Sequence, residues 1–329
     1  MNSAFPSAAT DAAHAPQFVQ VHREDAAELR AELLQGLRQP NAEVSPKFLY
    51  DALGSRLFEA ITELPEYYPT RTEAAIFTAH GAAMAQAIGA GVTLIDLGAG
   101  NCAKAARLLT LLDARRYVAI DISVDFLREA LQALSRVHPS LPMLGLGLDF
   151  STTLGLPADA CDGLPAFFYP GSSIGNFNRP QALAFLRRIR EQATDGGLLI
   201  GVDLVKPVEI LEPAYDDALG VTAAFNLNLL RYLNRLIGSD FDPRQWQHVA
   251  LYNCVEARIE MHLQARDALT VAWPGGKRTF RAGERIHTEN SYKHELEGFA
   301  TLLREAGFAT SRHWTDPQRW FAVFWAGAA

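Results

Sequence analysis

The middle of the chain alternates short apolar runs with helical patterns, and several of these runs end on an acidic residue. The run Thr93–Leu97 is apolar or β-branched except at Asp96, which predicts a buried parallel strand that breaks into a glycine-containing turn. Strands that alternate with helices are typical of an α/β fold with a parallel sheet. Further strands are predicted at 117–122, 143–150, 166–169 and 197–203, and helices at 104–112 and 180–193.

The N-terminal part of the chain has a different pattern, rich in helical periodicity and in aromatic residues. Helices are predicted at 24–35 and 72–88, and four apolar residues between positions 57 and 64 recur at helical spacing. The segment 65–71 holds two adjacent tyrosines between two prolines, which would prevent a helix from continuing. We predict that this segment is a loop that covers a pocket; ordinary packing of each tyrosine is the alternative.

The region 206–282 interrupts the alternation of strands and helices. A helix at 222–236 is followed by strands at 249–257 and 258–263, with more strand candidates around Thr270 and Thr279. The earlier pattern returns with a helix at 292–306, capped by Gly307, and a last strand at 319–325. The region therefore reads as an insertion into the sheet domain.

These patterns predict two domains and an N-terminal tail. One domain, with the parallel sheet, would combine residues 66–205 and 292–329, and an α+β domain would combine 21–65 with the insertion 206–291. Residues 1–20 are rich in Ala, Pro and Ser and are predicted to be a disordered tail.

Composition and charge exclude several classes of protein. The 329 residues are 49% hydrophobic, which is enough for a large buried core, and the formal net charge of −7 without a basic block argues against binding to nucleic acid. No apolar run approaches the roughly 20 residues of a membrane helix, and the N-terminus lacks a signal-peptide pattern, so we expect a cytoplasmic protein without a membrane partner. Three widely spaced cysteines predict neither a disulfide framework nor a metal site.

The turn after the first predicted strand has the features of a nucleoside-cofactor site. Gly98 and Gly100 permit positive φ and a close backbone approach. Asp121 ends the next strand about twenty residues later, where an acidic residue can accept both hydroxyls of a ribose. Asp149 ends the third strand, and Phe150 beside it would add an aromatic wall.

The same turn favours a methyl donor over a dinucleotide. A dinucleotide fold usually has a third glycine where this chain has Ala103, and the carboxylate of Asp96 would repel a pyrophosphate. S-adenosylmethionine instead carries a sulfonium and an ammonium, which suit an acidic surrounding. We therefore predict S-adenosylmethionine as the cofactor.

The loop 170–176 follows the fourth strand at the edge where open α/β sheets bind ligands, and its Asn176 offers both a donor and an acceptor.

Several stretches together resemble the histidine N-alpha-methyltransferases of ergothioneine biosynthesis. They are residues 45–71, DLGAGNCAK, FFYPGSSIGNF, AYDDALGVTAAFNLNLL and RIHTENSYK, and the resemblance extends from about residue 45 to 326. It implies a Rossmann-like S-adenosylmethionine-dependent methyltransferase domain with a second α+β substrate-binding domain built from the N-terminal part and an insertion. It also implies trimethylation of the α-amine of L-histidine, which yields hercynine, without a metal; a monomer is the default expectation.

The resemblance assigns roles to individual positions. Tyr50, Asn176 and Tyr215 match the residues that hold the amine and carboxylate of the amino acid and act in catalysis, and Tyr67 would serve both ligands. Ala99, Asn101 and Cys102 depart from the Ser and Thr common in relatives. The remaining substrate positions are Met261, Glu289 and Ser291 around the imidazole, and the cofactor positions are Tyr67, Gly98, Lys104, Asp121, Asp149 and Phe150.

The substrate preference rests on Glu289 and Ser291. If 286–291 is extended, side chains two apart point to one face, so the carboxylate and the hydroxyl can address both ring nitrogens of one imidazole. The alternatives are that Glu289 pairs with a surface Arg or Lys, and that the substrate is another aromatic amino acid such as tryptophan. A third alternative is a non-catalytic protein that only binds S-adenosylmethionine.

Overall fold

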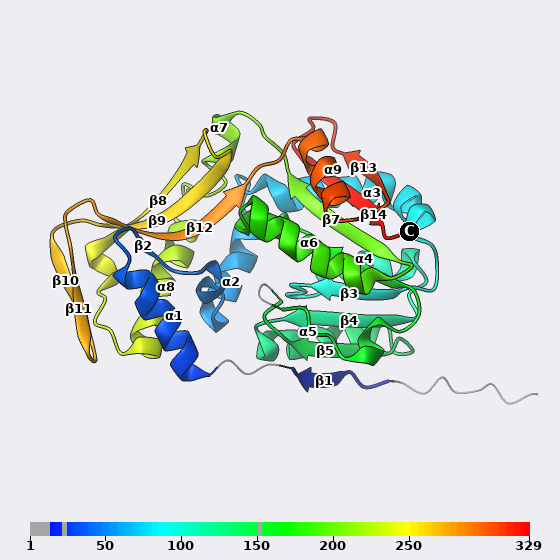
Figure 1. The fold of residues 1–329 in the computed structure, drawn as a ribbon, viewed down its shortest axis with the longest axis horizontal. Coiled ribbons are helices and arrows are strands. Elements are labelled where there is room, and N and C mark those ends of the chain that lie inside the picture. Colours follow the sequence, from blue (N-terminus) through cyan, green and yellow to red (C-terminus); the bar gives the residue numbers. More distant parts are fainter. Residues whose placement is uncertain (1–13, 22–24, 151–152) are drawn as a thin grey trace, which may run out of the picture.

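A mostly parallel sheet is the largest element of the protein. The computed structural model describes residues 14–21, 25–150 and 153–329. The sheet has eight strands in the order β1-β5-β4-β3-β6-β7-β14-β13, parallel from β1 to β7, with β14 antiparallel to both of its neighbours (Figure 1). The strand order reverses between β3 and β6, and such a switch point opens a crevice at the carboxyl ends of the strands. The strands are β1 (Gln17–Gln20), β3 (Thr93–Leu97), β4 (Arg116–Asp121), β5 (Met143–Gly147), β6 (Pro165–Tyr169), β7 (Gly197–Asp203), β13 (Thr310–Thr315) and β14 (Phe321–Gly327).

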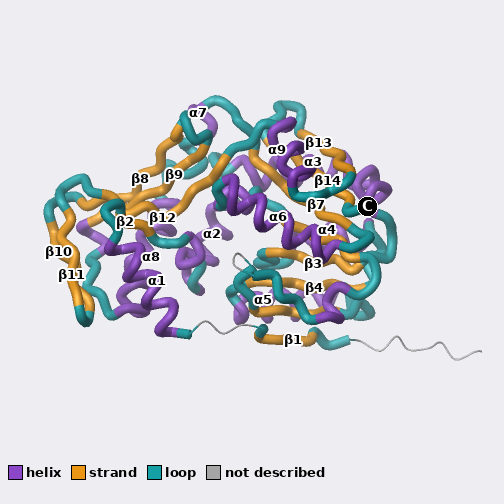
Figure 2. Tube along the Cα trace, in the orientation of Figure 1, coloured by secondary structure: helices purple, strands orange, loops and turns teal. Residues whose placement is uncertain are grey.

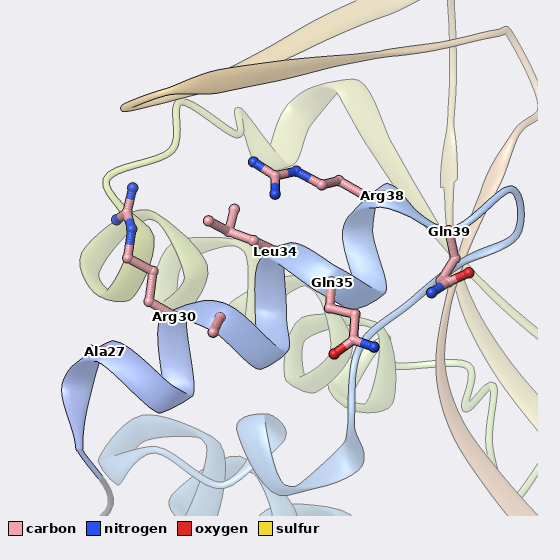
Figure 3. Close-up of a pocket in the computed structure, with 7 residues that line it drawn as sticks. Ala27, Arg30, Leu34, Gln35, Arg38 and Gln39 are labelled. Carbon is pink, nitrogen blue, oxygen red and sulfur yellow. The ribbon is translucent and has the colours of Figure 1, made fainter.

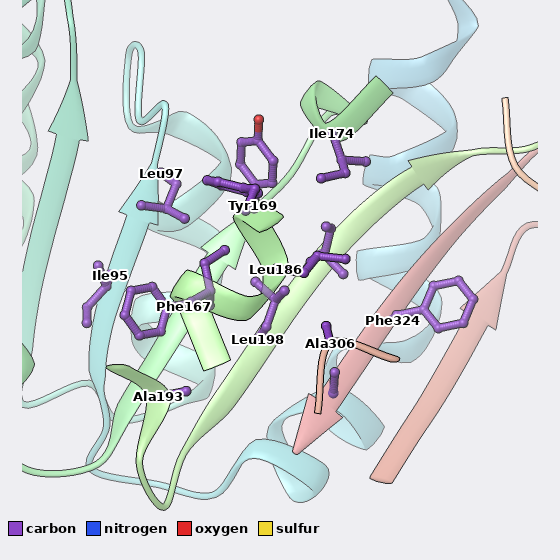
Figure 4. Packing of buried hydrophobic residues seen from close by; sticks show 14 of the residues in the cluster. Ile95, Leu97, Phe167, Tyr169, Ile174, Leu186, Ala193, Leu198, Ala306 and Phe324 are labelled. Atoms are coloured by element: carbon purple, nitrogen blue, oxygen red, sulfur yellow. The ribbon is translucent and has the colours of Figure 1, made fainter. Parts of the chain in front are cut away.

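Helices cover both faces of this sheet because successive strand residues point to opposite sides. Ile95 and Leu97 of β3 lie in the core cluster that contains α6 and α9, part of which Figure 4 shows, whereas Leu94 lies in the cluster with α3, α4 and α5. The α/β fold class is therefore confirmed. The helices are α3 (Tyr68–Ile88), α4 (Ala103–Leu111), α5 (Val124–Val137), α6 (Arg179–Ala193) and α9 (Leu296–Glu305).

A second core joins segments that are far apart in the sequence. A four-stranded sheet, ordered β2-β12-β9-β8, packs with α1, α2 and α8, and Figure 2 shows it beside the larger sheet. One buried apolar cluster combines residues between 33 and 68 with residues between 211 and 286. Its elements are α1 (Ala26–Arg38), β2 (Ala42–Glu43), α2 (Ala52–Thr62), α7 (Val208–Leu211), α8 (Val221–Ile237), β8 (Trp246–Asn253), β9 (Arg258–Ala265), the hairpin β10 (Leu269–Trp273) and β11 (Gly276–Phe280), and β12 (Arg285–Tyr292).

The predicted disordered tail is wrong at its end. Residues 17–20 form β1, which pairs in parallel with β5 and places Phe18 over Gly145, where a Cβ would lie 2.7 Å from the ring. The pairing gives backbone groups at the sheet edge their hydrogen-bond partners, and it depends on a strand 127 residues away rather than on local composition. Residues 1–13 of the predicted tail lie outside the described part of the chain.

Three element boundaries also differ from the predictions. Pro69 lies in the first turn of α3 and not in a loop, and the helix begins at Tyr68. A proline is tolerated there because the N–H groups of the first turn have no partner within the helix. The third strand ends at Gly147 instead of residue 150. Tyr292 belongs to β12, where it pairs with Arg258, and the following helix begins only at Leu296.

One further surface feature lies along α1. A groove along α1 is lined by Arg30, Leu34 and Arg38 together with neighbouring residues (Figure 3). Arg30 donates to the carbonyls of Ile237 (2.6 Å) and Pro274 (3.0 Å), so its guanidinium closes the end of α8. Among the described residues, no helix combines the length and apolarity that a membrane crossing requires.

Candidate active site

The glycine turn after β3 is held by the carboxylate at the end of β4. Gly98 and Gly100 have φ of 75° and 53°, the region that glycine adopts without strain. The Gly100 N–H donates to Asp121 Oδ2 (2.9 Å) and the Ser123 N–H donates to Oδ1 (2.8 Å). Burial raises the pKa of Asp121 above its ordinary value. Each carboxylate oxygen keeps lone-pair capacity for a further donor such as a ribose hydroxyl.

The end of the third strand forms the other side of this turn. The Phe150 ring lies 3.6 Å from the position of a Cβ at Gly98, so only a residue without a side chain leaves this surface open. Phe150 also contacts Tyr169 edge to face, with ring centroids 5.8 Å apart. Asp149 lies 3.6 Å from the ammonium of Lys47, which follows α1. The predicted aromatic wall and carboxylate thus face the glycine turn and the smaller sheet.

A buried carboxylate lies beneath the turn. Tyr117 donates to Asp96 Oδ2 (2.8 Å), whereas Oδ1 is enclosed and has no hydrogen-bond partner among the described residues. Burial raises the pKa of Asp96 to about 7. Because an enclosed acceptor without a partner is costly, a cationic donor such as the ammonium of S-adenosylmethionine fits this position. Cys102, one of the departures, is a buried N-terminal residue of α4 with φ of 60°, and burial raises its pKa to about 12.

Lys104 forms an ion pair that the sequence did not indicate. Its ammonium lies 2.7 Å from Glu73 Oε2, and Glu73 Oε1 accepts the N–H of Gly171 (2.8 Å). Glu73 is 1% exposed. It therefore joins α3, α4 and the loop after β6 around the switch point.

Tyrosine rings from distant parts of the chain gather on the side of the smaller sheet. Tyr67 lies 6.2 Å from Tyr215 and 6.1 Å from Phe58, and Phe58 lies 5.6 Å from Tyr50, all edge to face. Burial, with a contribution from the charge of Glu289, raises the pKa of Tyr50 and of Tyr67 well above the ordinary value, so both hydroxyls stay protonated. The charge of Glu73 makes a smaller contribution to the raised pKa of Tyr67.

The strand β12 carries Glu289 and Ser291, two of the three residues that are predicted to contact the imidazole. Residues 286–291 are extended as expected, with Glu289 opposite Met261 in the sheet. Ser291 Oγ lies 2.7 Å from the hydroxyl of Tyr215. Glu289 Oε2 is enclosed and has no hydrogen-bond partner among the described residues, and burial, opposed by Lys293, raises its pKa to about 7. The alternative of a surface pair for Glu289 is therefore wrong.

The loop after β6 brings Asn176 to the same strand. The short helical turn Ser173–Asn176 packs on β12, because a Cβ at Gly175 would lie 3.0 Å from the carbonyl oxygen of Tyr292 and 3.5 Å from Ser291 Oγ. The helix α6 begins directly afterwards, and a capping box between Asn178 and Gln181 fixes its start. The turn that ends with Asn176 is thereby held against β12.

Tyr215 is positioned by its neighbours in ways that the sequence did not reveal. Asn226 donates to His248 Nδ1 (2.9 Å), so Nε2 of that ring carries the proton and donates to the Tyr215 carbonyl (2.8 Å). Asp217 accepts the N–H groups of Val221 (3.0 Å) and Thr222 (2.7 Å), which fixes the start of α8 beside the tyrosine.

A buried charged network beneath the hydroxyls was also missed. Asp203, at the end of β7, accepts from Tyr68 (2.6 Å) and pairs with Lys206 (2.5 Å) and Lys293 (2.8 Å). Although burial alone would raise it, the two ammonium groups hold the pKa of Asp203 below its ordinary value, and burial lowers the pKa of Lys206 to about 8. The rule of acidic strand ends, already applied to three strands, could have singled out Asp203 as a fourth.

The site thus has two adjoining halves. One is an acid-bordered glycine turn at a switch point, and the other is a tyrosine-rich surface with an unpartnered carboxylate oxygen. The family model of S-adenosylmethionine-dependent, histidine-specific methyltransferases matches residues 29–328. The chain belongs to this family.

Several relatives of this histidine-specific methyltransferase have names that refer to N-methylation or to ergothioneine biosynthesis. It is 41% identical to the histidine N-alpha-methyltransferase of Mycolicibacterium smegmatis over 88% of this chain and 91% of that protein. It is 34% identical to ergothioneine biosynthesis protein 1 of Neurospora crassa over 81% of this chain but only 31% of that protein. A 4-dimethylallyltryptophan N-methyltransferase of Trichophyton verrucosum is 29% identical over 82% of this chain and 86% of that protein. The protein is accordingly an S-adenosylmethionine-dependent histidine methyltransferase.

Proposed function

We propose that this methyltransferase moves three methyl groups in succession to the α-amine of L-histidine and so makes hercynine for ergothioneine biosynthesis. The observation that carries the proposal is the enclosed, unpartnered oxygen of Glu289 beside Ser291, because an imidazole N–H would satisfy it. The relatives named for histidine N-alpha-methylation and for ergothioneine biosynthesis support the same substrate and pathway.

We assign the residues to two ligands. Gly98, Lys104, Asp121, Asp149 and Phe150 would hold S-adenosylmethionine, with Asp121 at the ribose and Asp149 and Phe150 at the adenine. Tyr50, Asn176 and Tyr215 would hold the amine and carboxylate of histidine, and Tyr67 would contact both ligands. Met261, Glu289 and Ser291 would surround the imidazole.

The chemistry asks for placement more than for a strong base. When bound, S-adenosylmethionine supplies an electrophilic methyl group and leaves as a neutral thioether. The chain must hold a neutral amine in line at about 3 Å, so the α-ammonium of histidine must lose a proton before each transfer. Tyr50 and Asn176 can accept from the amine while it carries protons, and water can remove them. The faces of Tyr50 and Tyr67 can stabilise the growing methylammonium by about 0.5–2 kcal/mol.

The test is methyl transfer by the purified protein, followed by mass spectrometry. Histidine should gain three methyl groups, and mono- and dimethylhistidine should also be substrates, with the dimethyl form bound at least as tightly as histidine. Product that stops at one methyl group would contradict the three-step reaction. Transfer to tryptophan in preference to histidine would support the indole alternative, and S-adenosylhomocysteine binding without any transfer would support a non-catalytic protein.

A further inference from the structure

A fully buried lysine contacts the hydroxyl of Ser291, at the proposed imidazole site, and the hydroxyl of Tyr215 beside it. Lys293 follows β12, and its side chain is 0% exposed. Its ammonium donates to Ser291 Oγ (2.8 Å) and the Tyr215 hydroxyl (3.1 Å), and it pairs with Asp203 Oδ2 (2.8 Å). These three contacts account for all three N–H donors of an ammonium group.

Asp203 carries two lysines that have different surroundings. Lys206 contacts the other oxygen of the carboxylate, the Tyr68 hydroxyl (2.9 Å) and the Leu204 carbonyl (2.5 Å). Both lysines compensate the same buried carboxylate, whereas Lys293 is the one that reaches the hydroxyls of Ser291 and Tyr215. The pair of lysines therefore provides a matched internal comparison.

The contacts of Lys293 determine what the two hydroxyls can offer to a ligand. An ammonium cannot accept a hydrogen bond, so Ser291 Oγ and the Tyr215 oxygen must both be acceptors toward it. The two oxygens are also 2.7 Å apart, so one of them donates to the other. One O–H group remains, and the oxygen that carries it already uses both lone pairs. Toward a ligand, that oxygen can only donate, whereas the other oxygen keeps one lone pair.

We infer that Lys293 is a positioning residue that makes the Ser291–Tyr215 pair a hydrogen-bond donor toward the substrate ring, so that the site selects a ring with an unprotonated nitrogen. This inference rests on the proposed function. Glu289 would accept the N–H of the imidazole while the hydroxyl pair donates to its other nitrogen, which requires the neutral ring in one tautomer. A pyrrole or an indole has no acceptor nitrogen and would leave the O–H unpaired.

The charges around Glu289 and around the Ser291–Tyr215 pair support these roles, in which Glu289 accepts and the hydroxyl pair donates. Glu289 is faced by the hydroxyls of Tyr50, Tyr67 and Tyr215, which stay protonated, and by the ammonium of Lys293, which favours its ionised form. A cationic imidazolium would have two donors and would meet both the remaining O–H group and the positive charge of Lys293. The neutral ring satisfies both sides.

The test compares Lys293→Met with Lys206→Met, which remove equivalent charges from the same carboxylate. For each, kcat/KM is measured for histidine and for the pyrrol-2-yl and pyrrol-3-yl analogues of histidine, which each retain one ring N–H but lack an acceptor nitrogen. The preference of the wild type for histidine over the better analogue should fall at least fivefold in Lys293→Met, because both oxygens then regain a lone pair and the remaining O–H group is no longer fixed as a donor toward the ring. In Lys206→Met the preference for histidine should stay within twofold of the wild-type value, although both variants lose stability.

Each outcome decides the inference. An unchanged preference in Lys293→Met, or equal changes in the two variants, overturns it and would mean that the remaining O–H serves the substrate carboxylate. If Lys293→Met does not fold, Lys293→Arg takes its place, since the longer planar group keeps the charge but cannot repeat the three contacts; the same ratio then decides. Failure of the wild type to methylate histidine would overturn the proposed function itself, whereas an unchanged ratio with active wild type would not.

Discussion

At the residue scale, the buried carboxylate of Glu289 lowers the stability of the free protein and offers an acceptor to a ligand. Glu289 is enclosed, one of its oxygens has no hydrogen-bond partner in the described part of the chain, and burial raises its pKa to about 7. Such a group is unfavourable in the free protein when it is ionised and becomes favourable when a donor binds it. The loss of stability in the free protein and the proposed selectivity for a ring N–H therefore both come from the buried carboxylate of Glu289.

Glu289→Gln should stabilise the free protein at alkaline pH while weakening histidine binding. The folded pKa of about 7 lies above the unfolded value of 4.5, so the contribution of this group is fully present below about pH 4.5 and is lost as pH rises through 7. At pH 8 the variant should be more stable by on the order of 1–3 kcal/mol, with little difference at pH 5. Thermal unfolding across this pH range measures it.

The kinetic part of the same prediction is a Michaelis constant for histidine raised at least tenfold, with S-adenosylhomocysteine affinity unchanged. Glu256→Gln, on an exposed turn, removes the same charge and is the control. A stability difference that does not depend on pH, or wild-type kinetics for histidine, would mean that the ring is recognised elsewhere.

Asp121→Asn should weaken cofactor binding through the turn as well as through the ribose. Both oxygens accept a backbone N–H, and an amide nitrogen cannot accept either of them, so one end of the clamp between Gly100 and Ser123 is lost. We expect S-adenosylhomocysteine affinity to fall at least tenfold and the melting temperature to fall by a few degrees. Isothermal titration measures the first, with Asp125→Asn on the exposed first turn of α5 as the control. Equal affinities for wild type and Asp121→Asn would remove Asp121 from the cofactor site.

At the scale of elements, the contact between the turn Ser173–Asn176 and β12 joins the two halves of the site. The large sheet contributes the turn and the smaller sheet contributes the strand, and they meet at Gly175. Asn176 and Ser291, which we propose to bind the substrate, come from opposite sides of this contact. Its geometry should control histidine binding more than cofactor binding.

Gly175→Ala tests the contact directly. A Cβ would lie 3.0 Å from the backbone oxygen of Tyr292, and because this is backbone rather than a flexible side chain, the turn must move. We expect a loss of stability of about 1–3 kcal/mol and a Michaelis constant for histidine raised about tenfold, with S-adenosylhomocysteine affinity retained. Gly298→Ala, whose nearest contact would be 3.6 Å, should leave both constants unchanged. Loss of cofactor affinity in Gly175→Ala would contradict the separation of the two halves.

At the scale of the whole molecule, the two cores are built from interleaved parts of the chain. One apolar cluster combines early and late segments, while the large sheet is closed at one edge by β1 and at the other by the antiparallel pair of β13 and β14. The edge strand β1 lies far along the sheet order from the switch point. It should contribute stability without contributing to chemistry.

Deletion of residues 1–24 should therefore lower the melting temperature by several degrees and leave kcat/KM for histidine within twofold. The deletion uncovers Gly145 and the edge of β5. Deletion of residues 1–13, which keeps β1, is the control, and scanning calorimetry with steady-state kinetics provides the comparison. Equal losses of stability in the two deletions would show that β1 is not the stabilising part.

The sequence by itself determined the α/β class, the strands of the central sheet except β1 and β13, and the region of the insertion, because buried parallel strands and amphipathic helices leave local periodic patterns. Acidic strand ends and glycines likewise marked Asp121 and the turn at Gly98. The domain boundaries and the roles of the site residues stay predictions. Only the tertiary structure decided that β1 pairs with β5, that Glu289 is enclosed rather than paired at the surface, and that Asp203, Lys206 and Lys293 form one network. Gln17 of β1 and its partner Leu144 of β5 are 127 residues apart, and Asp203 and Lys293 are 90 residues apart. Burial and pKa at such contacts are set by distant partners rather than by local sequence.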